Sequence, residues 1–201
     1  MYKYFGILCC LFLLSCETEK KQMEIKGSVV GAEYENELVY LVPLKGVTAE
    51  TVDSTYIKEG RFSFSLPIDS PEIRIIRTRP ILRLKLQELL VVAEPGSIAV
   101  ELNSVSRAQG TPLNNRLQAW KDKKTAFDEA WYAAGQDENK DPTALKNDLS
   151  EIKKAFSEYN FKFVQENKAN IVGLFVFEIT RGSFSPEQRH ELEEPDSVFL
   201  P

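Results

Sequence analysis

The chain has 201 residues and carries 30 acidic against 25 basic side chains, which gives a net charge of −5. An acidic balance argues against nucleic-acid binding, which favours basic surfaces. All three cysteines, Cys9, Cys10 and Cys16, lie at the amino end. The body that follows them therefore has no thiol for an internal disulfide, a thiolate zinc site or a Cys-x-x-Cys redox pair.

The amino end has the three parts of a secretory signal. Lys3 supplies a positive charge, residues 5–14 form an apolar core, and Ser15 is a small residue just before Cys16. A membrane-spanning helix needs about 20 apolar residues, so this run is too short to be a simple anchor helix. We therefore predict a signal peptide over residues 1–15.

The end of this signal, Leu13-Leu14-Ser15-Cys16, resembles the lipobox of bacterial lipoproteins. The resemblance implies that Cys16 is lipidated and becomes the new amino terminus. The predicted mature protein has a short tether over 16–21 that follows the lipid anchor. Its body is expected to be held at the inner or outer membrane of the cell envelope and to face the periplasm or the cell surface. The alternative is an ordinary cleaved signal in which Cys16 is incidental.

Residues 22–105 predict an antiparallel β-sandwich of about seven short strands. Apolar or alternating runs bounded by turn residues favour strands at 24–30, 38–44, 51–57, 61–66, 73–77, 89–93 and 98–102. In the run 61–66, Phe62, Phe64 and Leu66 alternate with polar residues, so one face of that strand is expected to be buried.

Two turns in this region predict which strands pair. Lys58-Glu59-Gly60 is a three-residue connection with glycine at the left-handed position, which favours a hairpin between strands 51–57 and 61–66. Pro95-Gly96 has the chemistry of a type II turn and predicts that strands 89–93 and 98–102 pair antiparallel.

Residues 106–201 predict a helical region, which makes the fold α+β. Thr111-Pro112 and Asp141-Pro142 have the pattern of a helix cap followed by proline. Apolar residues recur at helical spacing after both, so we expect an antiparallel helical hairpin with the first helix ending near Gly135. Shorter helices are expected at Ile171–Thr180 and after the capping-box pattern at 185–188, the last one ending at Pro195.

Several segments resemble one family in their order and spacing. They are the first strand from Gly27 to Gly31, "VYL" at 39–41, "VDS" and "GRFSF" at 52–54 and 60–64, "EPGSIAV" at 94–100 and "QGTPLNN" at 109–115. The resemblance is to the domain of unknown function that precedes thioredoxin-like (AhpC/TSA-type) thiol–disulfide oxidoreductase domains in Bacteroidota lipoproteins. Family members continue into a Trp-Cys-x-x-Cys domain, whereas this chain carries no such motif.

One basic concentration is a candidate binding patch. It consists of Arg74, Arg77, Arg79, Arg83 and Lys85. The i, i+2 spacing of Arg77/Arg79 and of Arg83/Lys85 places each pair on one face of a strand. A functional patch would attract acidic lipid headgroups, glycans or a partner, and the favoured alternative is a solvated outer face that discourages edge-to-edge strand pairing.

The remaining polar and aromatic candidates favour structural roles. Asp53 and Glu94 are expected to make local hydrogen bonds or to open a turn. Trp120 and Trp131 share a helical register with leucines, which favours core positions over sugar-binding platforms. His190, the one histidine, lies in a polar stretch and is expected to be exposed.

Two classes of function stay open. No nucleophile–base pair, metal set, phosphate loop or dinucleotide fingerprint is visible, which predicts a non-enzymatic accessory or binding lipoprotein without a cofactor, with an envelope protein as its partner. The family resemblance implies the alternative, a truncated or partner-recognition half of a thiol–disulfide oxidoreductase system that lacks its catalytic domain. Thiol exchange requires a thiolate, so in either case the body is not expected to be an enzyme.

Overall fold

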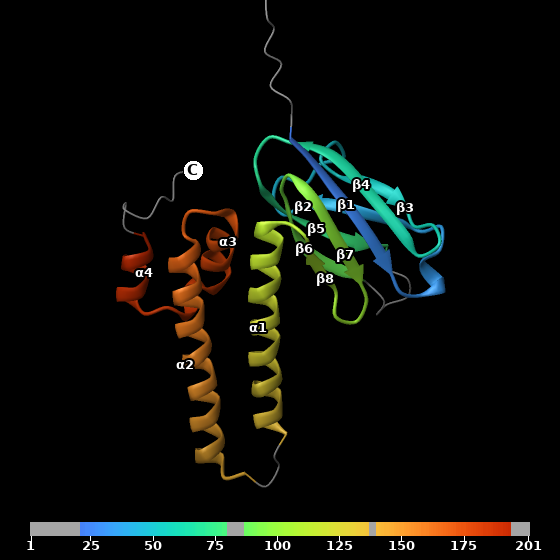
Figure 1. The fold of residues 1–201 in the computed structure, drawn as a ribbon. Helices are drawn as coiled ribbons and strands as arrows, with labels where there is room; N and C mark the ends of the chain where they lie inside the picture. Colours follow the sequence, from blue (N-terminus) through green and yellow to red (C-terminus); the bar gives the residue numbers. More distant parts are fainter. Residues whose placement is uncertain (1–20, 80–86, 137–139, 194–201) are drawn as a thin grey trace, which may run out of the picture.

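The computed structural model describes residues 21–79, 87–136 and 140–193 (Figure 1). The predicted signal peptide, the lipidation residue Cys16, the patch residues Arg83 and Lys85, and Pro195 lie outside these ranges. The structure has a β-sandwich in its first half and helices in its second, which confirms the predicted α+β class (Figure 1).

Two four-stranded sheets form the sandwich (Figure 1). The order is β4-β1-β7-β8 in one sheet and β3-β2-β5-β6 in the other. The strands are β1 (Lys21–Val29), β2 (Leu38–Pro43), β3 (Asp53–Tyr56), β4 (Arg61–Ile68), β5 (Glu72–Thr78), β6 (Glu88–Ala93), β7 (Gly96–Leu102) and β8 (Arg107–Gln109). A short helical turn, η1 (Ala32–Tyr34), follows β1. The eighth strand, β8, pairs with β7 and lies beyond the boundary predicted at residue 105.

The core of the sandwich is made by side chains that alternate along each strand. Phe62 and Phe64 of β4 are buried and Leu66 packs partly buried against them, as the alternation predicts. Gly27 of β1 faces Phe62, and a Cβ atom added at Gly27 would lie 2.0 Å from the phenylalanine ring. Glycine at this position therefore leaves the space that the aromatic side chain fills.

The predicted hairpin between the third and fourth strands forms only at its turn. Lys58 and Arg61 exchange two backbone hydrogen bonds of 2.9 Å, and Glu59 and Gly60 both have positive φ. The Glu35 carboxylate accepts hydrogen bonds from the backbone N–H groups of these two turn residues. Beyond the turn the strands separate, because β3 joins one sheet and β4 joins the other.

The predicted pairing of β6 with β7 is wrong. β6 pairs with β5, whereas β7 crosses to the other sheet and pairs parallel with β1, so the sandwich is not wholly antiparallel. Gly96, with φ of 120°, begins β7 directly after the crossing. Alternating apolar residues of both strands still enter one core: Val91 of β6 and Ile98 of β7 belong to the same buried cluster, although their strands lie in different sheets.

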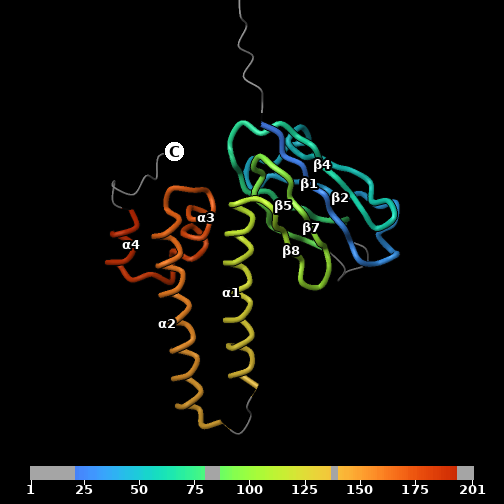
Figure 2. The backbone as a smooth tube through the Cα atoms, viewed as in Figure 1, coloured from blue at the N-terminus to red at the C-terminus, as the bar shows by residue number. Residues whose placement is uncertain are grey.

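The helices form a long hairpin with two short helices beside it (Figure 1, Figure 2). They are α1 (Pro112–Gly135), α2 (Pro142–Asn167), α3 (Ile171–Thr180) and α4 (Pro186–Glu193), with a short helical turn, η2 (Arg181–Ser183), between the last two. The start of α1 contacts β6 and β8, and the far ends of α1 and α2 project beyond the sandwich (Figure 2). In the part of the chain that the structure describes, no helix has the length and apolar character to cross a membrane.

Local sequence signals explain where the helices begin. The Asp141 carboxylate accepts hydrogen bonds from the N–H groups of Thr143 and Ala144, as predicted for a cap before proline. Ser185 and Gln188 bond each other's backbone N–H groups reciprocally, which is the predicted capping box.

The predicted burial of both tryptophans is correct for one and wrong for the other. Trp120 is 3% exposed and packs against α3, whereas Trp131 is 45% exposed. The difference follows from position along α1, because Trp120 lies beside the sandwich and α3 while Trp131 lies on the projecting part of the hairpin. Helical periodicity gave the same expectation for both side chains.

Candidate functional site

A groove between α3 and one end of the sandwich is the main candidate site. It encloses about 590 Å³ and is lined by Leu44, Lys45, Glu72, Ile73, Ile171, Leu174, Phe175, Glu178 and Ile179. We call it the sheet–helix groove. Six of these side chains are apolar, and the charged ones are a lysine and two glutamates. No serine, threonine, cysteine or histidine is among the described residues that line it.

Helix α3 forms one wall of this groove because it is apolar on nearly all sides. Val172 and Val176 are fully buried toward the hairpin and the sheet, while Ile179 on the other side is 53% exposed. The Asn170 side chain caps the helix by accepting hydrogen bonds from the N–H groups of Val172 and Gly173. A Cβ at Gly173 would lie 2.1 Å from a backbone oxygen of α2, so glycine permits this close packing.

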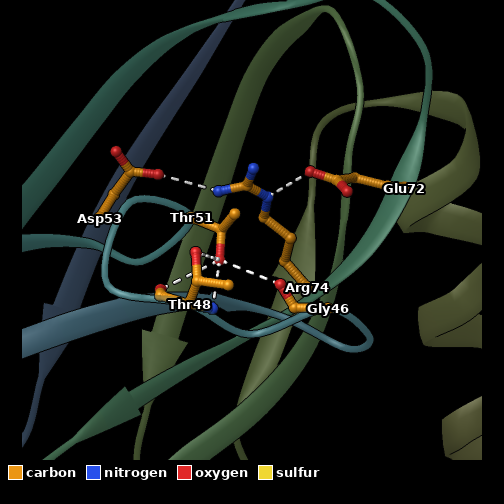
Figure 3. A network of polar contacts seen from close by, with 6 residues as sticks. All are labelled: Gly46, Thr48, Thr51, Asp53, Glu72 and Arg74. Carbon is orange, nitrogen blue, oxygen red and sulfur yellow. Dashed lines mark hydrogen bonds and ion pairs between the residues drawn. The ribbon is translucent and has the colours of Figure 1, made fainter.

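A charged cluster adjoins the groove through Glu72 (Figure 3). The side chain of Arg74 is 15% exposed and lies between two carboxylates: its Nη1 is 2.9 Å from Asp53 Oδ2, and its Nε is 2.5 Å from Glu72 Oε1. Next to it, Thr51 Oγ1 bonds to the backbone of Thr48 and Gly46 in the loop before β3 (Figure 3). Arg74 therefore secures the ends of β3 and β5.

The residues of the predicted basic patch do not share one environment. Arg74 is bound by two carboxylates, whereas Arg77 and Arg79 are exposed, with Arg79 Nη1 4.0 Å from Glu37 Oε2. Arg74 and Arg77 also lie on opposite faces of β5, since they are separated by an odd number of positions. The expectation that the patch protects a sheet edge is wrong for Arg74 and Arg77, because both lie on β5 and this strand lies between β2 and β6.

Edge protection comes instead from α1, which covers the free edges of both β6 and β8. Asn114 on α1 accepts from the N–H of Val92 at 2.9 Å and donates to the C=O of Val92 at 2.8 Å, as a neighbouring strand would. Gln118 accepts from the N–H of Ala108 in β8 at 3.0 Å. Because these side chains satisfy edge groups of β6 and β8, no further strand can add at those positions.

Glu94 binds the backbone at the start of α1. Its Oε1 accepts hydrogen bonds from the N–H groups of Leu113 at 2.8 Å and Asn114 at 3.0 Å, and the side chain is 6% exposed. The carboxylate thus caps α1 in place of Thr111, whose side chain makes no bond to the helix backbone. The structural role expected for Glu94 is confirmed, although its partner is a helix and not a local turn.

We call the contacts of Glu94, Asn114 and Gln118 between α1 and the sheet edges the clasp. The segments that contain the Glu94–Asn114 contact, 94–100 and 109–115, are among those on which the family resemblance depends. Residues 23–117 match the model of the family described as Domain of unknown function (DUF4369). The DUF4369 match runs from β1 into α1, so it includes both sheets and the Glu94–Asn114 contact, while α2, α3 and α4 lie outside it. No curated protein and no solved structure matches the chain.

Just beyond the DUF4369 match, Lys121 continues the contact of α1 with β6. Its Nζ donates to the C=O of Leu90 at 3.2 Å. Burial lowers the pKa of Lys121 to about 8, with Asp122 opposing the shift and Arg107 adding to it. These contacts of α1 with the sheet edges are not among those predicted from the sequence. A signal for them is present, because Asn114, Gln118 and Lys121 form a polar stripe at helical spacing beside the apolar stripe.

The other candidates from the sequence have structural or surface positions. Asp53 makes the long-range ion pair with Arg74, and His190 lies exposed on α4. Across the described ranges, no group of three or more His, Cys, Asp or Glu side chains could hold a metal ion.

Proposed function

We propose that this protein is a cell-envelope lipoprotein, held in the membrane by lipid on Cys16, whose body is a non-enzymatic binding module. The observation that carries the proposal is the sheet–helix groove, whose open apolar walls suit an apolar side chain or segment of an envelope protein partner. Fully burying one large apolar side chain contributes about 1.5–3 kcal/mol, so a groove of this size can hold a partner without covalent chemistry.

The arrangement of charges supports a binding role for the groove. Lys45, Glu72 and Glu178 line it beside the apolar residues, and Glu72 is already engaged by Arg74. Charged groups around an apolar centre give orientation and specificity to an interface, while the apolar centre gives affinity. This combination favours recognition of a partner over turnover of a substrate.

The anchor is tested by metabolic labelling with a clickable fatty acid. We expect label on the wild-type protein and none on Cys16→Ser, because the multiple acyl chains that stable anchoring needs are placed on this cysteine. Equal label on both proteins, or release of the wild type from membranes by buffer alone, would contradict it.

The groove is tested by site-specific photo-crosslinking in the native host. A benzoylphenylalanine at Ile179, which is 53% exposed in the groove, is expected to capture a discrete protein. The matched control is the same group at Val105, which is 60% exposed and lies between β7 and β8. The same adducts from both positions, or none from Ile179, would overturn the proposal.

A second candidate function follows from the family resemblance: the body recognises a partner in thiol–disulfide exchange and does not carry out the exchange itself. No cysteine follows Cys16, and exchange needs a thiolate. In an insulin-reduction assay, the protein alone is expected to show background activity. Activity above background would contradict both candidate functions.

A further inference from the structure

We propose that the projecting end of the α1–α2 hairpin is a second docking surface, which takes an acidic amphipathic segment of a partner protein. A groove of about 400 Å³ lies there, formed by Trp131 of α1 and by Leu145, Leu149, Lys146 and Lys153 of α2, among others. We call it the hairpin groove. Figure 1 shows α3, which lines the sheet–helix groove, beside the opposite end of the hairpin.

The apolar floor of the hairpin groove is only half covered. Leu145 and Leu149 are partly buried and Trp131 is 45% exposed, although all three lie in the apolar stripes of their helices. The stripes pack together closer to the sandwich, where the rings of Phe127 and Phe156 are 5.0 Å apart. Toward the hairpin end the two helices alone do not bury their apolar residues.

The charges around this floor have one sign. Lys146 and Lys153 line the groove, and no acidic residue is among the described residues that line it. Within the described ranges, neither lysine makes an ion pair, whereas Lys154 and Lys162 on the same helix pair with Glu158 and Glu166. The sequence itself explains this difference, because Ser150 and Ser157 occupy the positions four residues after the two groove lysines.

Two free lysines beside an apolar floor are complementary to carboxylates that flank an apolar side chain. An amphipathic helix with an acidic border offers this pattern, and helices bind apolar grooves through residues spaced by three and four positions. Electrostatic complementarity of this kind selects the partner and steers its approach.

The position of the hairpin groove favours a protein over the membrane as its occupant. Helix α1 has 24 residues, which corresponds to a length of about 36 Å. Figure 1 shows the hairpin end and the start of β1 at opposite ends of the molecule. If the chain is held at Cys16, as proposed above, the hairpin groove lies at the end of the molecule opposite the anchored start of β1.

The test uses the purified full-length protein and two labelled helical peptides of leucine, alanine and charged residues. One peptide has glutamates beside a leucine face, and the other has lysines in their place. We expect the acidic peptide to bind, to shift Trp131 fluorescence, and to bind about tenfold more tightly than the basic one. The affinity is expected to fall with added salt, since the paired charges are exposed.

Matched charge variants locate the binding. Lys146→Gln with Lys153→Gln is expected to weaken binding of the acidic peptide about tenfold, whereas Lys154→Gln with Lys162→Gln, which removes the same charge from the same helix, leaves it unchanged. All four lysines are exposed, so the variants are expected to fold, as circular dichroism will check. An equal loss in both double variants would overturn the proposal.

Two further outcomes would also overturn it. If anionic phosphatidylglycerol vesicles bind through Lys146 and Lys153 while the acidic peptide does not, the surface is a membrane contact. If the protein forms dimers that Leu149→Glu separates, measured by sedimentation, a second copy occupies the hairpin groove.

Discussion

Glu94, directly after β6, and Asn114 of α1 meet at the junction of sandwich and helix, where the glutamate Oε1 lies 3.0 Å from the backbone nitrogen and 3.3 Å from the side-chain nitrogen of the asparagine. Both residues are almost fully buried. The residue that follows β6 thus caps the helix, while Asn114 of the helix closes the free edge of β6 at Val92. The sandwich and the helical hairpin are therefore expected to unfold together.

Replacing Asn114 by leucine tests this junction. The change leaves the N–H and C=O of Val92 without their partner, and each buried unpaired polar group costs about 1–3 kcal/mol. We expect the free energy of unfolding in urea to fall by about 2–4 kcal/mol. The control is Asn147→Leu at an exposed position of α2, where a change below about 0.5 kcal/mol is expected. Similar losses at both positions would show that the clasp contributes little.

Trp120 and Asn160 form a buried pair between α1 and α2 that a double-mutant cycle can measure. The indole N–H donates to Asn160 Oδ1 at 2.9 Å, and Asn160 Nδ2 is buried without a partner. Trp120→Phe alone removes the hydrogen bond to Asn160 Oδ1, and Asn160→Leu alone leaves the indole N–H unpaired. We expect the double variant to lose about 1–2 kcal/mol less free energy of unfolding than the two single variants lose in sum. Strictly additive losses would refute the coupling.

Lys121 predicts a dependence of stability on pH. Burial lowers its pKa from 10.5 to about 8 in the folded protein. Below about pH 8 the lysine is protonated in both the folded and the unfolded protein, and burial of its charge destabilises the folded state. Between about pH 8 and pH 10.5 only the unfolded protein keeps the proton, so the free energy of unfolding rises with pH in this window.

The measurement compares wild type with Lys121→Met, which has no charge to bury at this position. From about pH 7.5 to about pH 10, the free energy of unfolding of the wild type should gain about 2 kcal/mol relative to the variant. The comparison cancels the titration of other groups. Parallel pH profiles would mean that folding does not lower the pKa of Lys121.

Gly27→Ala tests the packing of β1 against Phe62. The added Cβ would lie 2.0 Å from the ring, so the ring or the strand must move, and we expect a loss of about 1–3 kcal/mol. Gly135 at the end of α1 has nothing within 4 Å of the corresponding position, and Gly135→Ala should be neutral or stabilising by up to about 1 kcal/mol. Thermal or urea unfolding of the two variants distinguishes these outcomes.

Much of the local structure could be read from the chain itself. The bounds of α3, the caps at Asp141 and Ser185, and the buried phenylalanines of β4 all follow from residue spacing and turn chemistry. The caps depend on hydrogen bonds between residues close in sequence, and the apolar side of β4 depends on the alternation of its own residues, so the local sequence is enough to predict them. The sandwich-then-helices order follows for the same reason.

The tertiary structure alone decided which partners those elements meet. The turns at Gly60 and Gly96 have the left-handed backbone their glycines allow, yet each connects strands of different sheets. Trp131 keeps its helical register but is 45% exposed, and Arg74 lies between carboxylates from two strands. Alternation and periodicity determine which side of an element is apolar; what covers that side depends on residues far along the chain, which no local pattern encodes.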